Sequence, residues 1–134
     1  MYNVQINRED DILIALSTAR KLIKMHQLYF TKVDEQKILV SISELTRNIL
    51  AHSRSNGLFT CEFISSPNNG IKITVTDNGV GIPNIDAILA GQINKNSSGL
   101  GLGLLGVKRL MDSFNIQTKN KGGTRIIVTK WGSQ

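Results

Sequence analysis

Apolar residues recur along this chain with two periods, one typical of helices and one typical of strands. Two long segments with helical spacing predict a first helix from about Asp11 to Leu28 and a second that starts near Thr31 and reaches about His52. Asp10 or Asp11 is expected to cap the first helix. The same spacing predicts a shorter helix from Leu102 to Phe114.

Four strands are predicted, at residues 4–6, 58–64, 71–76 and 124–131, and apolar and polar residues alternate at 4–6 and 71–76. A polar turn over 65–70 joins the second and third into a hairpin. Long helices combined with short strands predict an α+β fold. We expect an α/β sandwich with the helices packed on one face of a mixed, mostly antiparallel sheet. A length of 134 residues suits a single domain.

The segment between residue 81 and residue 99 differs in character from its surroundings. A short helical stretch at 85–90 is followed by a polar run at 92–98. A loop of this length in a small domain is usually functional or disordered. We therefore expect residues of about 83–98 to form a lid over a ligand site.

Composition narrows the class of protein. Hydrophobic residues make up 40% of the chain and charged residues 19%, which is ordinary for a globular domain. The single cysteine, Cys61, excludes an internal disulfide, and no zinc-like spacing is present. No apolar run approaches the length of a leader core or a membrane span, so a cytoplasmic protein with no membrane partner is expected.

The net charge of +6 could serve nucleic acid, an acidic protein or a polyphosphate, or could belong to a solvated basic face. Basic residues are frequent near the end of the chain, at Lys119, Lys121, Arg125 and Lys130. Aromatic residues make up only 5% of the chain, and no stacking pattern accompanies the cations. Nucleic acid is therefore the least favoured partner.

Glu44 and Asn48 stand four residues apart in the second predicted helix, so their side chains project from one face. A carboxylate can accept a proton or orient an attacking hydroxyl, and an amide oxygen can ligate Mg²⁺. A solvated polar helix face is the alternative explanation for this pair. His52, one turn further on, either reaches a phosphate or is an exposed histidine at the helix end.

Asp77 follows the strand at 71–76 and precedes Gly79 and Gly81. A carboxylate at a strand end can accept a hydrogen bond from an exocyclic amine such as that of adenine, whereas guanine has a carbonyl at that position. The glycines would let the backbone approach a base closely. An aspartate in a solvated turn is the alternative explanation.

Gly99, Gly101 and Gly103 open the third predicted helix. Free backbone N–H groups and the positive end of the helix dipole make such a start suitable for phosphate. Residues 101–106 also match the pattern G-x-G-x-x-G of dinucleotide-binding folds. A polar segment rather than a strand precedes this pattern, and isoleucines stand where its acidic residue is expected, which argues against a dinucleotide site.

Together these motifs resemble the nucleotide site of the GHKL ATPases, which have the Bergerat fold. The similar segments are Glu44-x-x-x-Asn48 (N box), Asp77-x-Gly79-x-Gly81 (G1 box), Gly99-x-Gly101-x-Gly103 (G2 box) and Gly123-Thr124 (last box). The resemblance covers residues 1–134 as one bare ATPase or kinase domain. Residues 42–49, 106–112 and 130–131 are similar to the RsbT-type stressosome switch kinases, within the anti-sigma-factor and serine-kinase branch.

The resemblance implies a role for each motif. Glu44 is the implied catalytic base or orients the acceptor hydroxyl, Asn48 is the implied Mg²⁺ ligand, and Asp77 is implied to bind the adenine amine. The other implied ATP contacts are His52, Gly79, Gly81, Ile82, Gly99, Leu100, Gly101, Leu102, Gly103 and Thr124.

The implied activity is that of a serine/threonine-protein kinase that transfers the γ-phosphate of ATP to STAS-domain antagonist proteins. Such kinases act in bacterial stress-response pathways that control sigma factors by partner switching. The same resemblance implies a PP2C-type phosphatase as a further partner. The alternative function is an anti-sigma factor that mainly sequesters a sigma factor, with nucleotide as its regulator.

Overall fold

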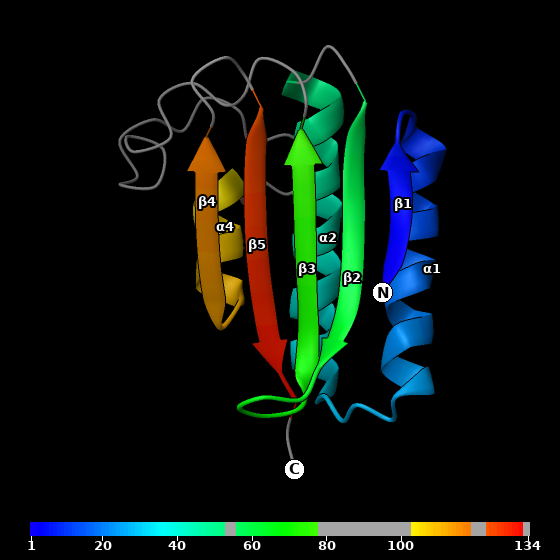
Figure 1. The fold of residues 1–134 in the computed structure, drawn as a ribbon, viewed down its shortest axis with the longest axis vertical. Helices are drawn as coiled ribbons and strands as arrows, with labels where there is room; N and C mark the ends of the chain where they lie inside the picture. Colours follow the sequence, from blue (N-terminus) through cyan, green and yellow to red (C-terminus); the bar gives the residue numbers. More distant parts are fainter. Residues whose placement is uncertain (53–55, 78–102, 119–122, 133–134) are drawn as a thin grey trace.

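The computed structural model describes residues 1–52, 56–77, 103–118 and 123–132. In these residues one layer of helices packs against one sheet (Figure 1). The elements in chain order are β1 (Tyr2–Ile6), α1 (Glu9–Met25), α2 (Lys32–His52), β2 (Gly57–Ile64), β3 (Gly70–Asp77), α4 (Gly103–Leu110), β4 (Ser113–Thr118) and β5 (Thr124–Trp131). The sheet order is β1-β2-β3-β5-β4, and each of these neighbouring pairs is antiparallel.

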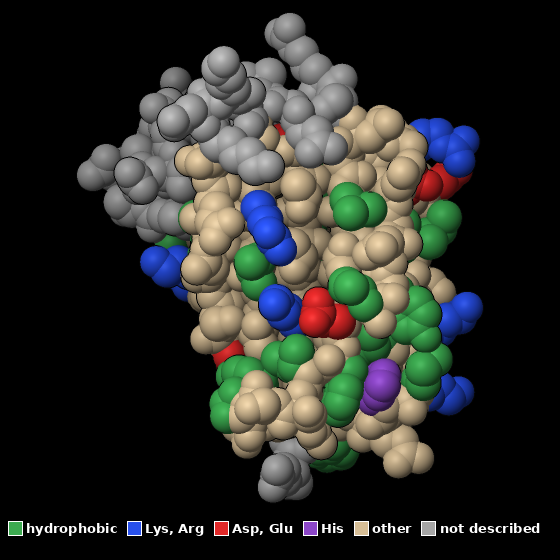
Figure 2. All heavy atoms as spheres, viewed as in Figure 1, with side chains coloured by type: hydrophobic (Ala, Val, Ile, Leu, Met, Phe, Trp, Pro, Cys, Tyr) green, Lys and Arg blue, Asp and Glu red, His purple; other side chains and the backbone are tan. Residues whose placement is uncertain are grey.

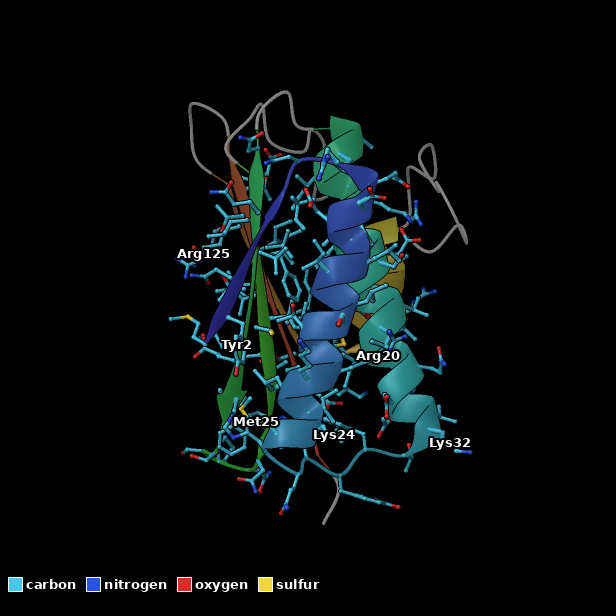
Figure 3. The ribbon with its side chains drawn as sticks, turned by 90° about the vertical axis from the view of Figure 1, so that its right-hand side faces the viewer. Tyr2, Arg20, Lys24, Met25, Lys32 and Arg125 are labelled. Carbon is cyan, nitrogen blue, oxygen red and sulfur yellow. The ribbon has the colours of Figure 1, made fainter. Side chains whose placement is uncertain are left out.

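All described helices lie on one face of the sheet, which confirms the predicted α+β sandwich (Figures 1 and 3). The other face is open. Figure 2 shows it as a mainly polar surface with scattered apolar side chains and a few charges. Within the described residues, no helix is both long and apolar enough to span a membrane.

The core lies between the helices and the covered face of the sheet. The buried stripe of α1 includes Ala15, Ala19 and Leu22, and that of α2 includes Ile38 and Ile42. Every second strand residue points toward these helices, and the inward set includes Phe59, Cys61, Ile73, Val75, Ile126 and Val128. The alternation seen in the sequence therefore identifies the buried face correctly. Burial raises the pKa of the Cys61 thiol to about 11.

The start of α1 differs from the prediction. Arg8, rather than Asp10 or Asp11, occupies the cap position, and Asp11 lies in the first turn. There the Asp11 Oδ2 atom accepts hydrogen bonds from the backbone N–H of Asn7 at 2.8 Å and of Arg8 at 3.0 Å. The aspartate thus satisfies donors that precede the helix, from inside its first turn. In α2 the predicted start is confirmed, because Thr31 Oγ1 accepts from the Asp34 N–H at 3.1 Å.

The predicted helix to Phe114 is wrong beyond Leu110, and the edge strand β4 was missed. Asp112 marks the change of direction, since its N–H donates to the Thr129 carbonyl at 2.9 Å and its Oδ2 atom accepts from the Trp131 N–H at 2.8 Å. After this anchor, Phe114 and Ile116 alternate with polar residues and pack on the core. Pairing with β5 overrides the local helical pattern.

We predict that Asp11→Asn lowers stability at neutral pH. The backbone N–H of Asn7, followed by that of Arg8, holds the pKa of Asp11 below its ordinary value of 3.8. A carboxylate with a lowered folded pKa contributes stability above its unfolded pKa, and this contribution is lost as the pH falls through the folded pKa. Denaturant unfolding should therefore separate parent and variant at pH 7 and bring them together in acid. Asp10→Asn, on the exposed side of the same turn, is the control; an equal loss in both variants would contradict the role of Asp11.

Candidate functional site

Glu44 and Asn48 lie one turn apart in the middle of α2, and both are buried. Glu44 is 3% exposed and Asn48 is 9% exposed. A solvated polar helix face would leave such side chains in water, so that alternative is excluded for this pair. Burial of a polar side chain costs stability unless the side chain is hydrogen-bonded, so such residues commonly serve a structural hydrogen bond or a ligand. Their burial therefore strengthens the interpretation of Glu44 and Asn48 as functional.

Asp77 and Thr124 occupy the end of the sheet. Asp77 is the last residue of β3 and pairs with Thr124, the first residue of β5. Both have the same parity as the inward residues Val75 and Ile126, so they belong to the face that the helices cover. Both are buried, at 6% and 3% exposure. Asp77 is thus not an aspartate in a solvated turn.

One close contact brings α2 and this end of the sheet together. Gly57, the first residue of β2, pairs with Asp77. A Cβ atom on Gly57 would lie 2.4 Å from Cγ2 of Ile49, the neighbour of Asn48 in α2, and 3.0 Å from the Thr76 carbonyl oxygen. Only glycine permits so close an approach of helix and strand at this position. Figure 1 shows the last turns of α2 at the same end of the molecule as the end of β3 and the start of β5.

The helix α4 begins beside this region and packs against α2. Its first residue, Gly103, has a φ of +57°. This left-handed backbone favours glycine, although a Cβ atom there would meet nothing within 4 Å. The requirement at Gly103 is therefore conformational rather than steric.

Several predicted site residues lie outside the described residues: Gly79, Gly81, Ile82, Gly99, Leu100, Gly101 and Leu102, together with the predicted lid at 83–98. His52 is the last residue of α2. Of the predicted site residues, Asp77 and Thr124 pair with each other, and Asn48 precedes Ile49, which packs against the Gly57 that pairs with Asp77; Glu44 lies one turn before Asn48 on the same helix. In the described part of the chain, no group of three or more His, Cys, Asp or Glu side chains could hold a metal ion by itself.

These residues offer oxygen acceptors of the kind that suit an adenine nucleotide with Mg²⁺. Asn48 offers an amide oxygen, which suits a hard cation that keeps waters and phosphate oxygens as its other ligands. Asp77 offers a carboxylate at a strand end, where it can accept from an amine donor. Glu44 adds a second carboxylate on the helix that carries Asn48. The residues therefore fit the group that the motifs imply.

Lys130 is one of the basic residues near the chain end, but its side chain is buried. It alternates in phase with Ile126 and Val128 along β5, so its side chain lies on the face of the sheet that the helices cover. The Nζ atom donates to the Leu110 carbonyl at 2.9 Å and to Asp112 Oδ1 at 3.2 Å. Asp34, in the first turn of α2, has a carboxylate oxygen 3.9 Å from the same nitrogen. Lys130 thus links the end of α4 to the start of α2.

The comparisons with known proteins agree with the family that the motifs resemble. The profile of the histidine kinase-, DNA gyrase B- and HSP90-like ATPases matches residues 33–132. The chain belongs to this family, which is the GHKL superfamily that the motifs resemble. It is 38% identical over 128 residues to the serine/threonine-protein kinase RsbT of Bacillus subtilis (strain 168). That alignment covers 96% of this chain and 94% of RsbT, so this protein is of the RsbT-like type.

We predict that Lys130→Met destabilises the fold by about 2 kcal/mol, because it removes a hydrogen-bonded cation and keeps most of the apolar stem. Asp112 remains partly solvated, which keeps the loss below that of a fully buried pair. Arg125→Met is the control, since Arg125 is exposed on the same strand. Chemical denaturation should show a change within about 0.5 kcal/mol for that control. An equally small change for Lys130→Met would contradict the structural role of the lysine.

Proposed function

We propose that this protein, an ATP-dependent serine/threonine kinase by its family, transfers the γ-phosphoryl group of ATP to a Ser or Thr of a STAS-domain antagonist protein. The observation that carries the proposal is the pair Glu44 and Asn48, buried one turn apart beside the strand ends that hold Asp77 and Thr124. The similarity to a serine/threonine-protein kinase over nearly the whole chain supports the same activity. We place this activity in bacterial partner switching in the cytoplasm.

Each residue has a distinct part in the proposed reaction. Asp77 binds the adenine base, and Asn48 would hold Mg²⁺, which would neutralise charge on the transferring phosphoryl group. Glu44 accepts the proton of the acceptor hydroxyl or orients that hydroxyl for attack. The oxygen of the acceptor forms a bond to the γ-phosphorus as the bond to the β,γ-bridging oxygen breaks. Catalysis of this kind consists mainly of positioning and charge stabilisation.

The backbone N–H groups at residues 99–103 and the hydroxyl of Thr124 complete the proposed nucleotide contacts, with His52, Gly79, Gly81 and Ile82 as the remaining members. Residues of about 83–98 form the proposed lid of a single domain that spans residues 1–134. A PP2C-type phosphatase is the proposed second partner. Nucleic acid and membranes are not among the proposed partners.

The direct test is incubation with ATP, Mg²⁺ and purified candidate STAS-domain proteins, with phosphate on the acceptor Ser or Thr read by mass spectrometry. We expect stoichiometric transfer to one acceptor site. The alternative, an anti-sigma factor, gains if no acceptor is phosphorylated while a sigma factor binds the protein in a nucleotide-dependent way.

We predict that Asn48→Ala abolishes phosphotransfer while the protein still folds. The change removes the proposed Mg²⁺ ligand but leaves the neighbouring apolar residues, including Ile49, in place. Asn115→Ala, the same change at an exposed position of β4, should retain full activity. Circular dichroism verifies folding of both variants. Transfer by Asn48→Ala at the parent rate and ordinary Mg²⁺ concentration would overturn the assignment.

We predict that Asp77→Asn weakens ATP binding by about ten- to a hundred-fold, because a charge-assisted hydrogen bond is worth roughly 1.5–3 kcal/mol. The amide can still accept a hydrogen bond but loses the charge. Titration calorimetry with ATP and with GTP provides the measurement, and the parent protein should prefer ATP. Unchanged ATP affinity in the variant, or a parent protein that prefers GTP, would contradict the role of Asp77.

A further inference from the structure

The exposed large apolar side chains in the described part of this protein all come from its first quarter. Among the described residues, every exposed large hydrophobic lies within the first 33 positions: Met1, Tyr2, Leu13, Ile14, Met25, Tyr29 and Val33. The matched ATPase profile begins only at residue 33. Four of the seven, Tyr2, Leu13, Ile14 and Met25, belong to β1 and α1, which precede the segment that the ATPase family shares.

The strand β1 is an edge of the sheet that lacks the usual protection. It pairs with β2, and none of the other described strands pairs with it. Its sequence, Tyr-Asn-Val-Gln-Ile, has no charged residue and no Pro, the residues with which proteins commonly prevent edge-to-edge pairing. The other edge strand, β4, also has no charged residue or Pro, and its apolar residues pack on the core as Val4 and Ile6 of β1 do; β1 differs in having the exposed Tyr2 and the exposed apolar residues of α1 beside it. An unprotected edge presents backbone donors and acceptors to an incoming strand.

One stripe of side chains on α1 lies beside this edge. Ile14, Lys21 and Met25 fall within an arc of about 40° around the helix axis, given 100° per residue. Met25 is 60% exposed and Ile14 is 50% exposed. The Tyr2 hydroxyl donates to the Met25 sulfur at 3.4 Å, which fixes this stripe beside β1. Figure 3 shows Tyr2 and Met25 in the same part of the molecule, with Arg20 and Lys24 on the adjoining surface of α1.

The cations of this region are not neutralised within the described residues. Arg20, Lys21 and Lys24 are exposed, while the described ion pairs involve Lys37, Arg47 and Lys130. Basic residues near a helix C-terminus also suit the helix dipole, so the charges alone identify no ligand. The cations together with the exposed apolar residues and the free strand edge do indicate a ligand. These three features are complementary to an acidic, extended segment.

We propose that the free edge of β1 binds an extended acidic segment of a partner protein, which adds a strand to the sheet. Along α1, Met25 and Lys21 are about 6 Å apart and Lys21 and Ile14 about 10 Å apart. Alternate side chains of a strand are separated by about 7 Å. A segment whose inward face reads apolar, acidic, apolar therefore matches the order Met25, Lys21, Ile14. Backbone pairing with β1 supplies the affinity, and this order supplies the specificity.

This surface is separate from the nucleotide site. The row of paired residues that contains Asp77 and Thr124 continues through Gly57 to Ile6, at the end of β1, whereas Tyr2 pairs with Cys61 further along the sheet. A partner bound to the β1 edge can therefore leave uncovered the strand ends that hold Asp77 and Thr124, which lie at least two strands away. The inference goes beyond the proposed kinase function and does not require it.

The test uses the full chain, labelled with nitrogen-15, and two short synthetic peptides. In both peptides every second residue is Thr, so that Thr forms one face of the strand. The residues between them are Val, Glu and Ile in the first peptide and Val, Lys and Ile in the second. We expect the acidic peptide to shift the amide signals of Tyr2–Ile6 and to bind about tenfold or more tightly than the basic one, with an affinity that falls as salt rises. Lys21→Glu and Met25→Glu should each weaken binding of the acidic peptide by about tenfold.

The matched controls are Lys32→Glu and Val33→Glu, the same two changes at exposed positions in the first turn of α2. They should leave the peptide affinity within about twofold of the parent. All four variants should remain folded and should bind ATP as the parent does. No binding, equal binding of the two peptides, or shifts confined to another surface would overturn the proposal. Sedimentation that shows a dimer of the parent and a monomer of Met25→Glu would also overturn it, by assigning the edge to a second copy of this chain.

Discussion

The contact between Ile49 of α2 and the first residue of β2 is the constraint on which the site depends. Because Gly57 has no side chain, the helix comes close to the sheet at the level where Asp77 pairs with its neighbours. Asn48 precedes Ile49 in the helix, and Glu44 lies one turn before it. The apolar stripe of α2 therefore does more than fill the core: its fit against the strands fixes how far the polar residues of the same helix lie from Asp77 and Thr124.

Burial of the polar residues of the candidate site has an energetic consequence. Glu44, Asn48, Asp77 and Thr124 are all less exposed than is usual for their residue types. Such a group costs stability unless its hydrogen bonds are made, so a fold that places four of them together gives up apolar packing there. Apolar residues would stabilise this end of the sandwich more simply. The arrangement is understandable when the end of the sheet serves a polar, charged ligand.

Much of the fold could be predicted because local pattern and tertiary packing agree. Both long helices and the hairpin of β2 and β3 appear close to their predicted positions, since each has a continuous stripe or a strict alternation. The strand β4 could not be predicted in the same way. Its six residues follow directly on a helical pattern, and its identity as a strand depends on pairing with β5 and on the Asp112 anchor, which lie far apart in the sequence.

The site shows the same division between local and distant information. Glu44 and Asn48 are four residues apart, so helical geometry alone places them on one face. The pairing of Asp77 with Thr124 could not be derived from spacing, because it depends on β5 lying beside β3. Lys130 illustrates the limit most clearly. In the sequence it is one of several cations near the chain end, and only its parity with Ile126 and Val128 indicates that it points inward.

The distribution of charge and apolar surface divides the molecule by task. Lys130, a buried cation, stabilises the junction of α4 and α2 and contributes nothing to the exterior. The cations of α1 are exposed and accompany apolar side chains at a free strand edge. The net charge of +6 is therefore not one property with one purpose. Part of it is structural, and the part on α1 lies where a second protein can bind without covering the end of the sheet that holds Asp77 and Thr124.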